Sequence, residues 1–105
     1  MKDLSLAIYE EYLQDLYKTA TEQGLFMKLV EEIGETAEIL NIRAGRKAGD
    51  LDTTSELANE LVDIIHYAAA IAAINNIDLP KAIIEKDRKA SIKYNHSSLE
   101  EYMNR

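Results

Sequence analysis

The segment Lys28-Leu-Val-Glu-Glu-Ile-Gly-Glu-Thr-Ala-Glu38 decides the fold, because it combines an apolar helical pattern with closely spaced carboxylates. Leu29, Val30 and Ile33 recur at the three- and four-residue spacing of one helix face. The carboxylates are those of Glu31, Glu32 and Glu35. Residues three or four apart share a face of a helix, so the segment predicts a helix that presents an acidic cluster.

A second acidic element, Glu60-Leu-Val-Asp63, follows after 24 intervening residues and also lies in an apolar helical pattern. Glu60 and Asp63 are three residues apart and so share a face. Two neighbouring helices would bring both clusters together. Carboxylate oxygens are the ligands that Mg²⁺ prefers, usually shared with water and substrate phosphates. The pair of elements therefore predicts a site for divalent metal ions that hold phosphates.

The alternative is that these acids are solvated helix faces, which is the expected role of Glu38 or Glu56 taken alone. We favour a metal site for the combined cluster because of where its members lie. Ile33, Val62 and Ile64 are interleaved with the acids. The carboxylates are therefore expected at the edge of the apolar face and not opposite it.

Composition narrows the class of protein. A chain of 105 residues predicts one domain, 1–105, and the absence of cysteine fits a reducing, cytoplasmic setting. A formal net charge of −7 argues against binding to nucleic acid polymers, which need basic patches, although metal ions can bridge an acidic protein to polyphosphates. The first residues lack the apolar core of a signal peptide, and the apolar run 67–74 is expected to be too short to span a membrane.

The fold class is predicted to be all-α, because period-2 alternation is absent and four glycines and one proline leave long uninterrupted segments. The expected helices cover about residues 6–19, 24–44, 54–75 and 79–91, with a short terminal helix after Ser98. Thr53 or Thr54 is expected to cap the third helix and Asp78 the fourth. The polar stretch 46–52 is expected to be a surface loop.

Apolar spacing also predicts which side chains face inward. In the first helix these are Ile8, Tyr12, Leu13 and Leu16, and in the second Phe26, Leu29, Val30, Ile33, Ala37 and Leu40. Gly34 costs roughly 1 kcal/mol relative to alanine, which predicts a close approach by another helix or a ligand. The third helix carries two adjacent apolar stripes, so it is expected to be buried on two sides, and self-association would complete that burial.

The two acidic elements resemble a known family. Glu31-Glu-Ile-Gly-Glu35 and Glu60-Leu-Val-Asp63 match the EExxE…ExxD signature of the MazG-like all-α nucleoside triphosphate pyrophosphohydrolases. Asp63-Ile-Ile-His-Tyr67 continues the second motif. The stretch 76–86, followed by Lys93-Tyr-Asn95, is similar to the C-terminal part of single-domain members, including the dCTP pyrophosphatase branch. The resemblance covers roughly residues 25–95.

This resemblance implies a four-helix bundle that assembles as a homodimer or as a homotetramer of two dimers. It implies Mg²⁺-dependent hydrolysis, with Mn²⁺ as a possible substitute, of a nucleoside triphosphate to the monophosphate and pyrophosphate. A deoxynucleotide substrate and a role in nucleotide-pool control or cleaning are expected. The implied metal ligands are Glu32, Glu35, Glu60 and Asp63. Glu31 and Glu35 are the implied catalytic residues that orient or deprotonate the attacking water.

Four further residues are predicted to bind the substrate: Lys28, Lys86, Tyr94 and Asn95. Many relatives have an asparagine four residues after the lysine, where this chain has Ala90, so one phosphate or sugar contact differs. Lys28 has an alternative role as an ion-pair partner of the neighbouring glutamates. His66 follows Asp63 by three residues and is either a ligand or, as is commoner, a packed and hydrogen-bonded side chain.

Three other functions fit parts of the pattern. Phosphoribosyl-ATP pyrophosphohydrolase has a similar size and acidic pattern, but the C-terminal match favours the MazG-like branch. A di-iron carboxylate bundle normally carries Glu-x-x-His on two helices, and this chain has only Asp63-x-x-His66. A non-enzymatic acidic helical module would not need acids beside the apolar face.

Overall fold

The computed structural model describes residues 1–45 and 53–105, and within these ranges all regular structure is helical. The all-α prediction is therefore confirmed. The helices are α1 Leu6–Leu16, α2 Glu22–Arg43, α3 Thr53–Ile74, α4 Leu79–Lys93 and α5 Leu99–Met103. The predicted surface loop 46–52 lies outside the described residues.

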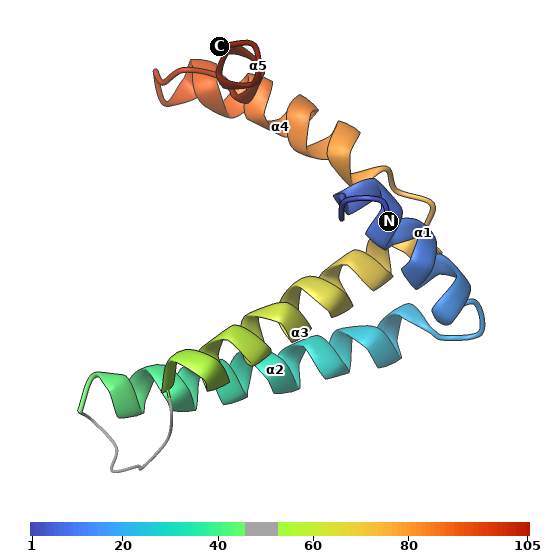
Figure 1. The fold of residues 1–105 in the computed structure, drawn as a ribbon, viewed down its shortest axis with the longest axis vertical. Coiled ribbons are helices and arrows are strands. Elements are labelled where there is room, and N and C mark those ends of the chain that lie inside the picture. The colour runs from blue at the N-terminus through green and yellow to red at the C-terminus, as the bar shows by residue number, and fades with distance from the viewer. Residues whose placement is uncertain (46–52) are drawn as a thin grey trace.

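The two long helices α2 and α3 run antiparallel and make the most extensive helix–helix contact of the described chain (Figure 1). Side chains at helical spacing form the seam between them. On α2 these are Leu25, Leu29, Glu32, Thr36 and Ile39, all at least half-buried. On α3, Leu57, Glu60 and Ile64 repeat at the same spacing and are also half-buried. Acidic residues thus occupy seam positions, between apolar neighbours.

The short helix α1 packs across the C-terminal half of α3. Leu13 is fully buried against the small side chains Ala69, Ala70 and Ala73. Alanine has no side chain beyond Cβ, so it lets a neighbouring helix approach closely. Leu25 from the first turn of α2 joins this cluster, which is the main apolar core of the chain.

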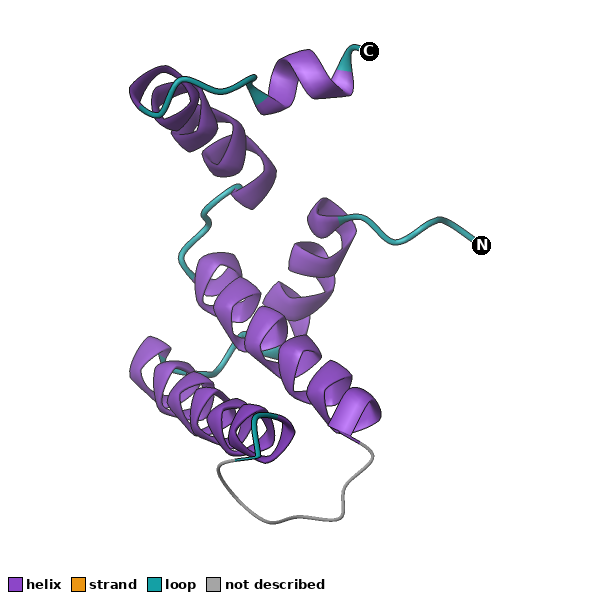
Figure 2. Ribbon diagram, turned by 90° about the vertical axis from the view of Figure 1, so that its left-hand side faces the viewer, coloured by secondary structure: helices purple, strands orange, loops and turns teal. Residues whose placement is uncertain are grey.

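The last two helices extend away from the central pair (Figure 2). Asp78 caps α4 as predicted, and the buried carboxylate of Glu10 accepts the backbone N–H of Leu79 at 2.8 Å. Helix α4 packs on α1 and α5, not on α2. The radius of gyration is 16.8 Å, against about 13 Å for a compact chain of this length. A single chain is therefore open.

Residues in the left-handed conformation follow the ends of α3 and α4. Asn76 has φ 56° and Asn95 has φ 53°. After each, the next backbone N–H bonds back across the helix end, from Ile77 to Ala72 and from His96 to Ser91. This is the Schellman arrangement, in which asparagine commonly replaces glycine. The predicted end of the third helix near residue 75 follows from it, whereas α4 continues to Lys93, two residues beyond its predicted end at about residue 91.

The inward faces of α1 and α2 differ from the prediction. Leu13 is fully buried as predicted, but Tyr12 and Leu16 are more than half exposed. Tyr9 of α1 and Tyr17, which follows its last residue, pack against the core in their place. On α2 the expected inward side chains Phe26, Val30, Ile33, Ala37 and Leu40 are exposed. The reason is that each helix has two apolar faces, and the one that packs within the chain also contains polar members. The prediction used apolar spacing alone, and it therefore chose the more apolar face, which is exposed in the single chain.

One local prediction needs correction, and another stays a prediction. Helix α3 begins at Thr53 itself, so neither Thr53 nor Thr54 precedes it as a cap. A Cβ added at Gly34 would meet no atom within 4 Å, so no close approach to this glycine occurs within the described chain.

Helix α3 is more apolar than the run 67–74 suggested. It has 22 residues and a mean hydropathy of 1.4 over its most apolar window, enough to cross a membrane by length and composition alone. This criterion is weak evidence, because core helices of other proteins also meet it. Glu60 and Asp63 would lie inside such a span, where charged side chains are costly.

Candidate metal centre

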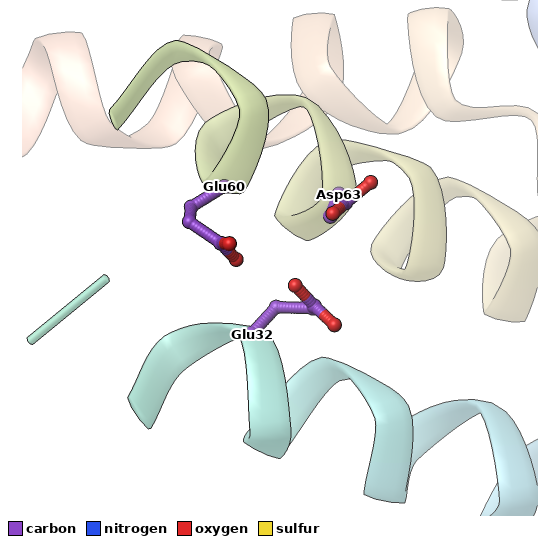
Figure 3. Close-up of side chains that lie close together, drawn as sticks. All are labelled: Glu32, Glu60 and Asp63. Atoms are coloured by element: carbon purple, nitrogen blue, oxygen red, sulfur yellow. The ribbon is translucent and has the colours of Figure 1, made fainter. Parts of the chain in front are cut away.

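Three carboxylates meet in the seam between the long helices. Glu32 projects from α2 and Glu60 and Asp63 project from α3, and their side chains point toward one another (Figure 3). One oxygen from each residue lies within 4.8 Å of the others. All three are half-buried. The two acidic elements therefore lie next to each other, as the sequence predicted. The antiparallel packing of α2 and α3 brings Glu32 close to Glu60 and Asp63.

Glu60 is the member most affected by its surroundings. Its Oε2 atom is buried and has no hydrogen-bond partner. A hydrogen bond with Glu32, burial, and the nearby charge of Glu35 raise the pKa of Glu60 from 4.5 to about 8. Packing like charges in a half-buried seam is unfavourable unless a cation compensates them.

These residues fit a hard divalent cation. A buried, unpartnered carboxylate oxygen costs free energy, and a bound cation would satisfy it. The donor set is entirely oxygen, which suits Mg²⁺ or Mn²⁺ and not a softer metal. Glu32, Glu60 and Asp63 would hold the ion.

The remaining predicted acids, Glu31 and Glu35, are exposed. Glu35 acts on Glu60 through a side-chain hydrogen bond and its charge, but it is not one of the three converging carboxylates. Glu31 is exposed, and one of its oxygens lies 3.5 Å from Lys28 Nζ in an ion pair. Lys28 therefore forms an ion pair with a neighbouring glutamate, which was the alternative to substrate binding.

The other predicted substrate residues lie apart from the carboxylates in the same chain. Lys86 is an exposed residue of α4, and Tyr94 is 66% exposed beyond its end. The Tyr94 ring packs under Lys93 Nζ at 5.2 Å. Asn95 is exposed and ends the helix in the left-handed conformation. One chain does not bring these residues to the acidic cluster.

His66 is a packed side chain, as the commoner alternative held. Its Nδ1 lies 2.8 Å from the Tyr9 hydroxyl and its Nε2 lies 2.7 Å from the Tyr17 hydroxyl. Sequence reasoning missed this network. The available signal was the placement of both tyrosines four residues on either side of Leu13, which is the spacing of one helix face.

The raised pKa of Glu60 predicts how the metal-free protein responds to pH. Below pH 4.5, Glu60 is protonated in the folded and unfolded states; between pH 4.5 and 8, the unfolded state loses the proton first. The free energy of unfolding should therefore fall as pH rises through this range. Urea unfolding in the presence of a chelator measures it. Glu60→Gln should flatten that slope, and parallel curves for the two proteins would contradict the expectation.

Known proteins resemble this chain in sequence and in fold. No family model matches the chain. dCTP pyrophosphatase 1 of Rattus norvegicus and of Mus musculus are each 35% identical to it over 68 residues, which is 61% of this chain and 40% of the relative. The chain thus spans less than half the length of these curated relatives. The crystal structure of iMazG from Vibrio DAT 722 is similar, with a TM-score of 0.65 and 30% identity over 89% of this chain and 100% of that chain.

The fold and the site define a class of all-α proteins in which two antiparallel helices bring acidic motifs together. The similarity to iMazG extends over the whole of that chain and includes both sequence and fold. The chain belongs to the MazG-like family of all-α nucleoside triphosphate pyrophosphohydrolases.

Proposed function

We propose that this protein hydrolyses a nucleoside triphosphate to the monophosphate and pyrophosphate with Mg²⁺ as cofactor, and that Mn²⁺ can substitute. The observation that carries the proposal is the convergence of Glu32, Glu60 and Asp63 within 4.8 Å. The buried, unpartnered oxygen of Glu60 supports it, because a carboxylate oxygen is the kind of atom that coordinates Mg²⁺. The family membership supports the same reaction.

The chain's own residues divide the work between holding the cofactor and handling water. When bound, the metal neutralises phosphate charge and lowers the pKa of water. Glu35 or Glu31, both exposed, orients the attacking water and takes its proton. The water oxygen bonds to the α-phosphorus, the bond from that phosphorus to the bridging oxygen breaks, and pyrophosphate leaves. Lys28 and Lys86 contribute positive charge toward the phosphates.

A deoxynucleotide is the favoured substrate within this proposal. The support is the name of the two curated relatives, which are dCTP pyrophosphatases. The role would be control or cleaning of the nucleotide pool in the cytoplasm. We also propose that the protein acts without a nucleic acid polymer or a membrane as partner. Its net charge of −7 supports the first part, because a phosphate backbone repels an acidic protein.

The working form is proposed to be a homodimer or homotetramer. Apolar side chains on the outer face of the long helix pair are about half exposed in one chain, and those on α3 are Leu61, Val62 and Ile65. The matching set on α2 is Phe26, Val30, Ile33 and Leu40. Burying these stripes against another copy removes apolar surface from water. It would also shield the apolar face that makes α3 resemble a membrane span.

Assembly would also complete the active site. Helix α4 does not pack on α2 within its own chain. Lys86, Tyr94 and Asn95 would therefore reach the carboxylates of a different copy, with Tyr94 or Asn95 against the nucleoside. Loss of Lys86 should then reduce activity less than loss of a metal ligand, because it removes one phosphate contact and leaves the metal in place.

The test combines a binding and a product measurement on the full chain. Millimolar Mg²⁺ or Mn²⁺ should raise the melting temperature, because a ligand that prefers the folded state stabilises it. The same ions should be required for pyrophosphate release in a panel of common NTPs and dNTPs. Equal rates with and without a chelator would contradict the proposal.

A further inference from the structure

A cavity of about 290 Å³ lies where α1, the end of α3 and the start of α4 meet. We call it the junction cavity. Its polar lining comes from α1 and from the connection between α3 and α4, and consists of Glu10, Glu11, Gln14, Asn76 and Asp78. Ala73 of α3 also lines it and follows Asp63 by ten residues, about 15 Å along the helix axis. The junction cavity is therefore separate from the metal centre.

Glu10 is the buried acid of this lining. It is only 9% exposed, and its Oε1 accepts the backbone N–H of Leu79 at 2.8 Å. Its other oxygen, Oε2, makes no hydrogen bond or ion pair with any described residue, and it is not sealed inside the protein as Oε2 of Glu60 is. A carboxylate that is nine-tenths buried is costly to leave with a single neutral donor. The second oxygen therefore favours a donor that enters from the cavity.

The other polar side chains of the lining also leave hydrogen-bond acceptors unused. Gln14 Nε2 donates to the Ala73 carbonyl at 3.3 Å and to Asn76 Oδ1 at 2.8 Å, so the Gln14 side-chain oxygen remains. Asp78 Oδ1 accepts the N–H of Lys81 as the N-cap of α4, and its second oxygen has no described partner. No lysine or arginine lines the cavity. Apart from the Asn76 amide nitrogen, the lining offers oxygens and suits a ligand rich in N–H donors.

The spread of the acids favours an organic cation over a metal ion. A metal ion needs ligand atoms that lie close together, and among the described residues only Glu32, Glu60 and Asp63 bring three acidic ligand atoms within 4.8 Å. The junction cavity also has three apolar lining residues, which are Ala7, Ala73 and Ile77. An aliphatic polyamine matches both features, because its ammonium groups donate to separate carboxylates and its methylene groups cover apolar surface.

We propose that the junction cavity binds a short aliphatic polyamine. Its ammonium groups would donate to the carboxylates of Glu10, Glu11 and Asp78, in a chain whose formal net charge is −7. Glu10 and Glu11 belong to α1 and Asp78 caps α4, so the ligand would hold these two helices together. None of these residues takes part in the proposed hydrolysis.

Isothermal titration calorimetry of the full chain with spermidine tests the site, at about 0.15 M ionic strength to screen distant charges. Spermidine should bind and should raise the melting temperature. Glu11→Gln should weaken binding about tenfold or more, because it removes one charge-assisted hydrogen bond. Glu10→Gln keeps an acceptor for Leu79 and should weaken binding to a similar extent. Glu101→Gln removes the same charge from exposed α5, outside the cavity, and should change binding less than about twofold.

Two further arms separate this site from general charge attraction and from the metal centre. Propylamine has a single ammonium group and should bind at least about tenfold more weakly than spermidine. Glu60→Gln should bind spermidine as the wild type does. Because Glu11 is exposed, Glu11→Gln keeps the test valid even where Glu10→Gln does not fold. A wild type that binds no spermidine, equal effects of Glu11→Gln and Glu101→Gln, equal binding of propylamine, or loss of binding in Glu60→Gln would overturn the inference.

Discussion

Replacing Glu60 by glutamine should reduce pyrophosphate release by more than about 100-fold while the protein stays folded. Changing a residue behind a metal ligand already costs about 10–100-fold, so losing the ligand itself should cost more. Glu60 converges with Glu32 and Asp63, and its unpartnered oxygen is the strongest sign of a cation. The same substitution removes a charge that the metal-free protein accommodates poorly, so its melting temperature without metal should not fall. Asp63→Asn should behave alike.

Glu56 provides the matched control, because it lies one turn earlier on the same helix and outside the cluster. Glu56→Gln removes the same charge and should change activity by less than about twofold, as expected for a surface substitution. Mg²⁺ should raise the melting temperature of wild type and Glu56→Gln but hardly that of Glu60→Gln. Equal metal shifts and equal activities in all three proteins would contradict this assignment of the ligands.

Introducing a charge into the exposed apolar stripe of α2 should separate the copies and abolish most activity. Leu40 is 47% exposed in one chain and lies two turns beyond Glu32. If a second copy covers it, Leu40→Asp would bury an uncompensated charge, which proteins avoid because of the high desolvation cost. Light scattering at micromolar concentration should give at least twice 11.9 kDa for wild type and 11.9 kDa for the variant.

The activity of that variant tests whether the site is shared between copies. All three converging carboxylates belong to one chain, so Mn²⁺ binding should survive dissociation. Pyrophosphate release should fall more than about tenfold, because Lys86 would no longer reach a neighbouring site; a phosphate contact of this kind contributes on the order of 1.5–3 kcal/mol. Leu4→Asp makes the same substitution at a leucine that is 80% exposed and lies before α1, outside the stripe, and serves as the control. A wild type that is a fully active monomer would refute the assembly.

The sequence predicted the helices well because their ends carry local signals. Asp78 and Ser98 each accept a backbone N–H as N-caps, and Asn76 ends α3. The N-cap at Thr21 was not predicted, and α2 begins two residues before its expected start at about residue 24. The inward faces were harder to predict. Helix α2 has one apolar stripe that faces outward in the single chain and a mixed stripe that packs on α3. Periodicity identifies apolar faces, but it does not say whether a face packs within the chain or outside it.

The site was predictable to the extent that it depends on spacing along two helices. Glu32, Glu60 and Asp63 converge because an antiparallel pair aligns their turns. The position of Lys86 could not be inferred, because it depends on the direction in which α4 leaves the core. The hydrogen bonds of Tyr9 and Tyr17 with His66 depend on the angle at which α1 crosses α3, and residue spacing in the sequence does not give that angle.

Hydrolysis of a deoxynucleoside triphosphate in ¹⁸O-water, with mass spectrometry of the products, tests the proposed reaction most directly. Attack of water at the α-phosphorus should place the label in the nucleoside monophosphate and leave the pyrophosphate unlabelled. Label in the pyrophosphate instead would keep the cleaved linkage but move the attack to the β-phosphorus. Release of orthophosphate with a nucleoside diphosphate would contradict the proposed reaction.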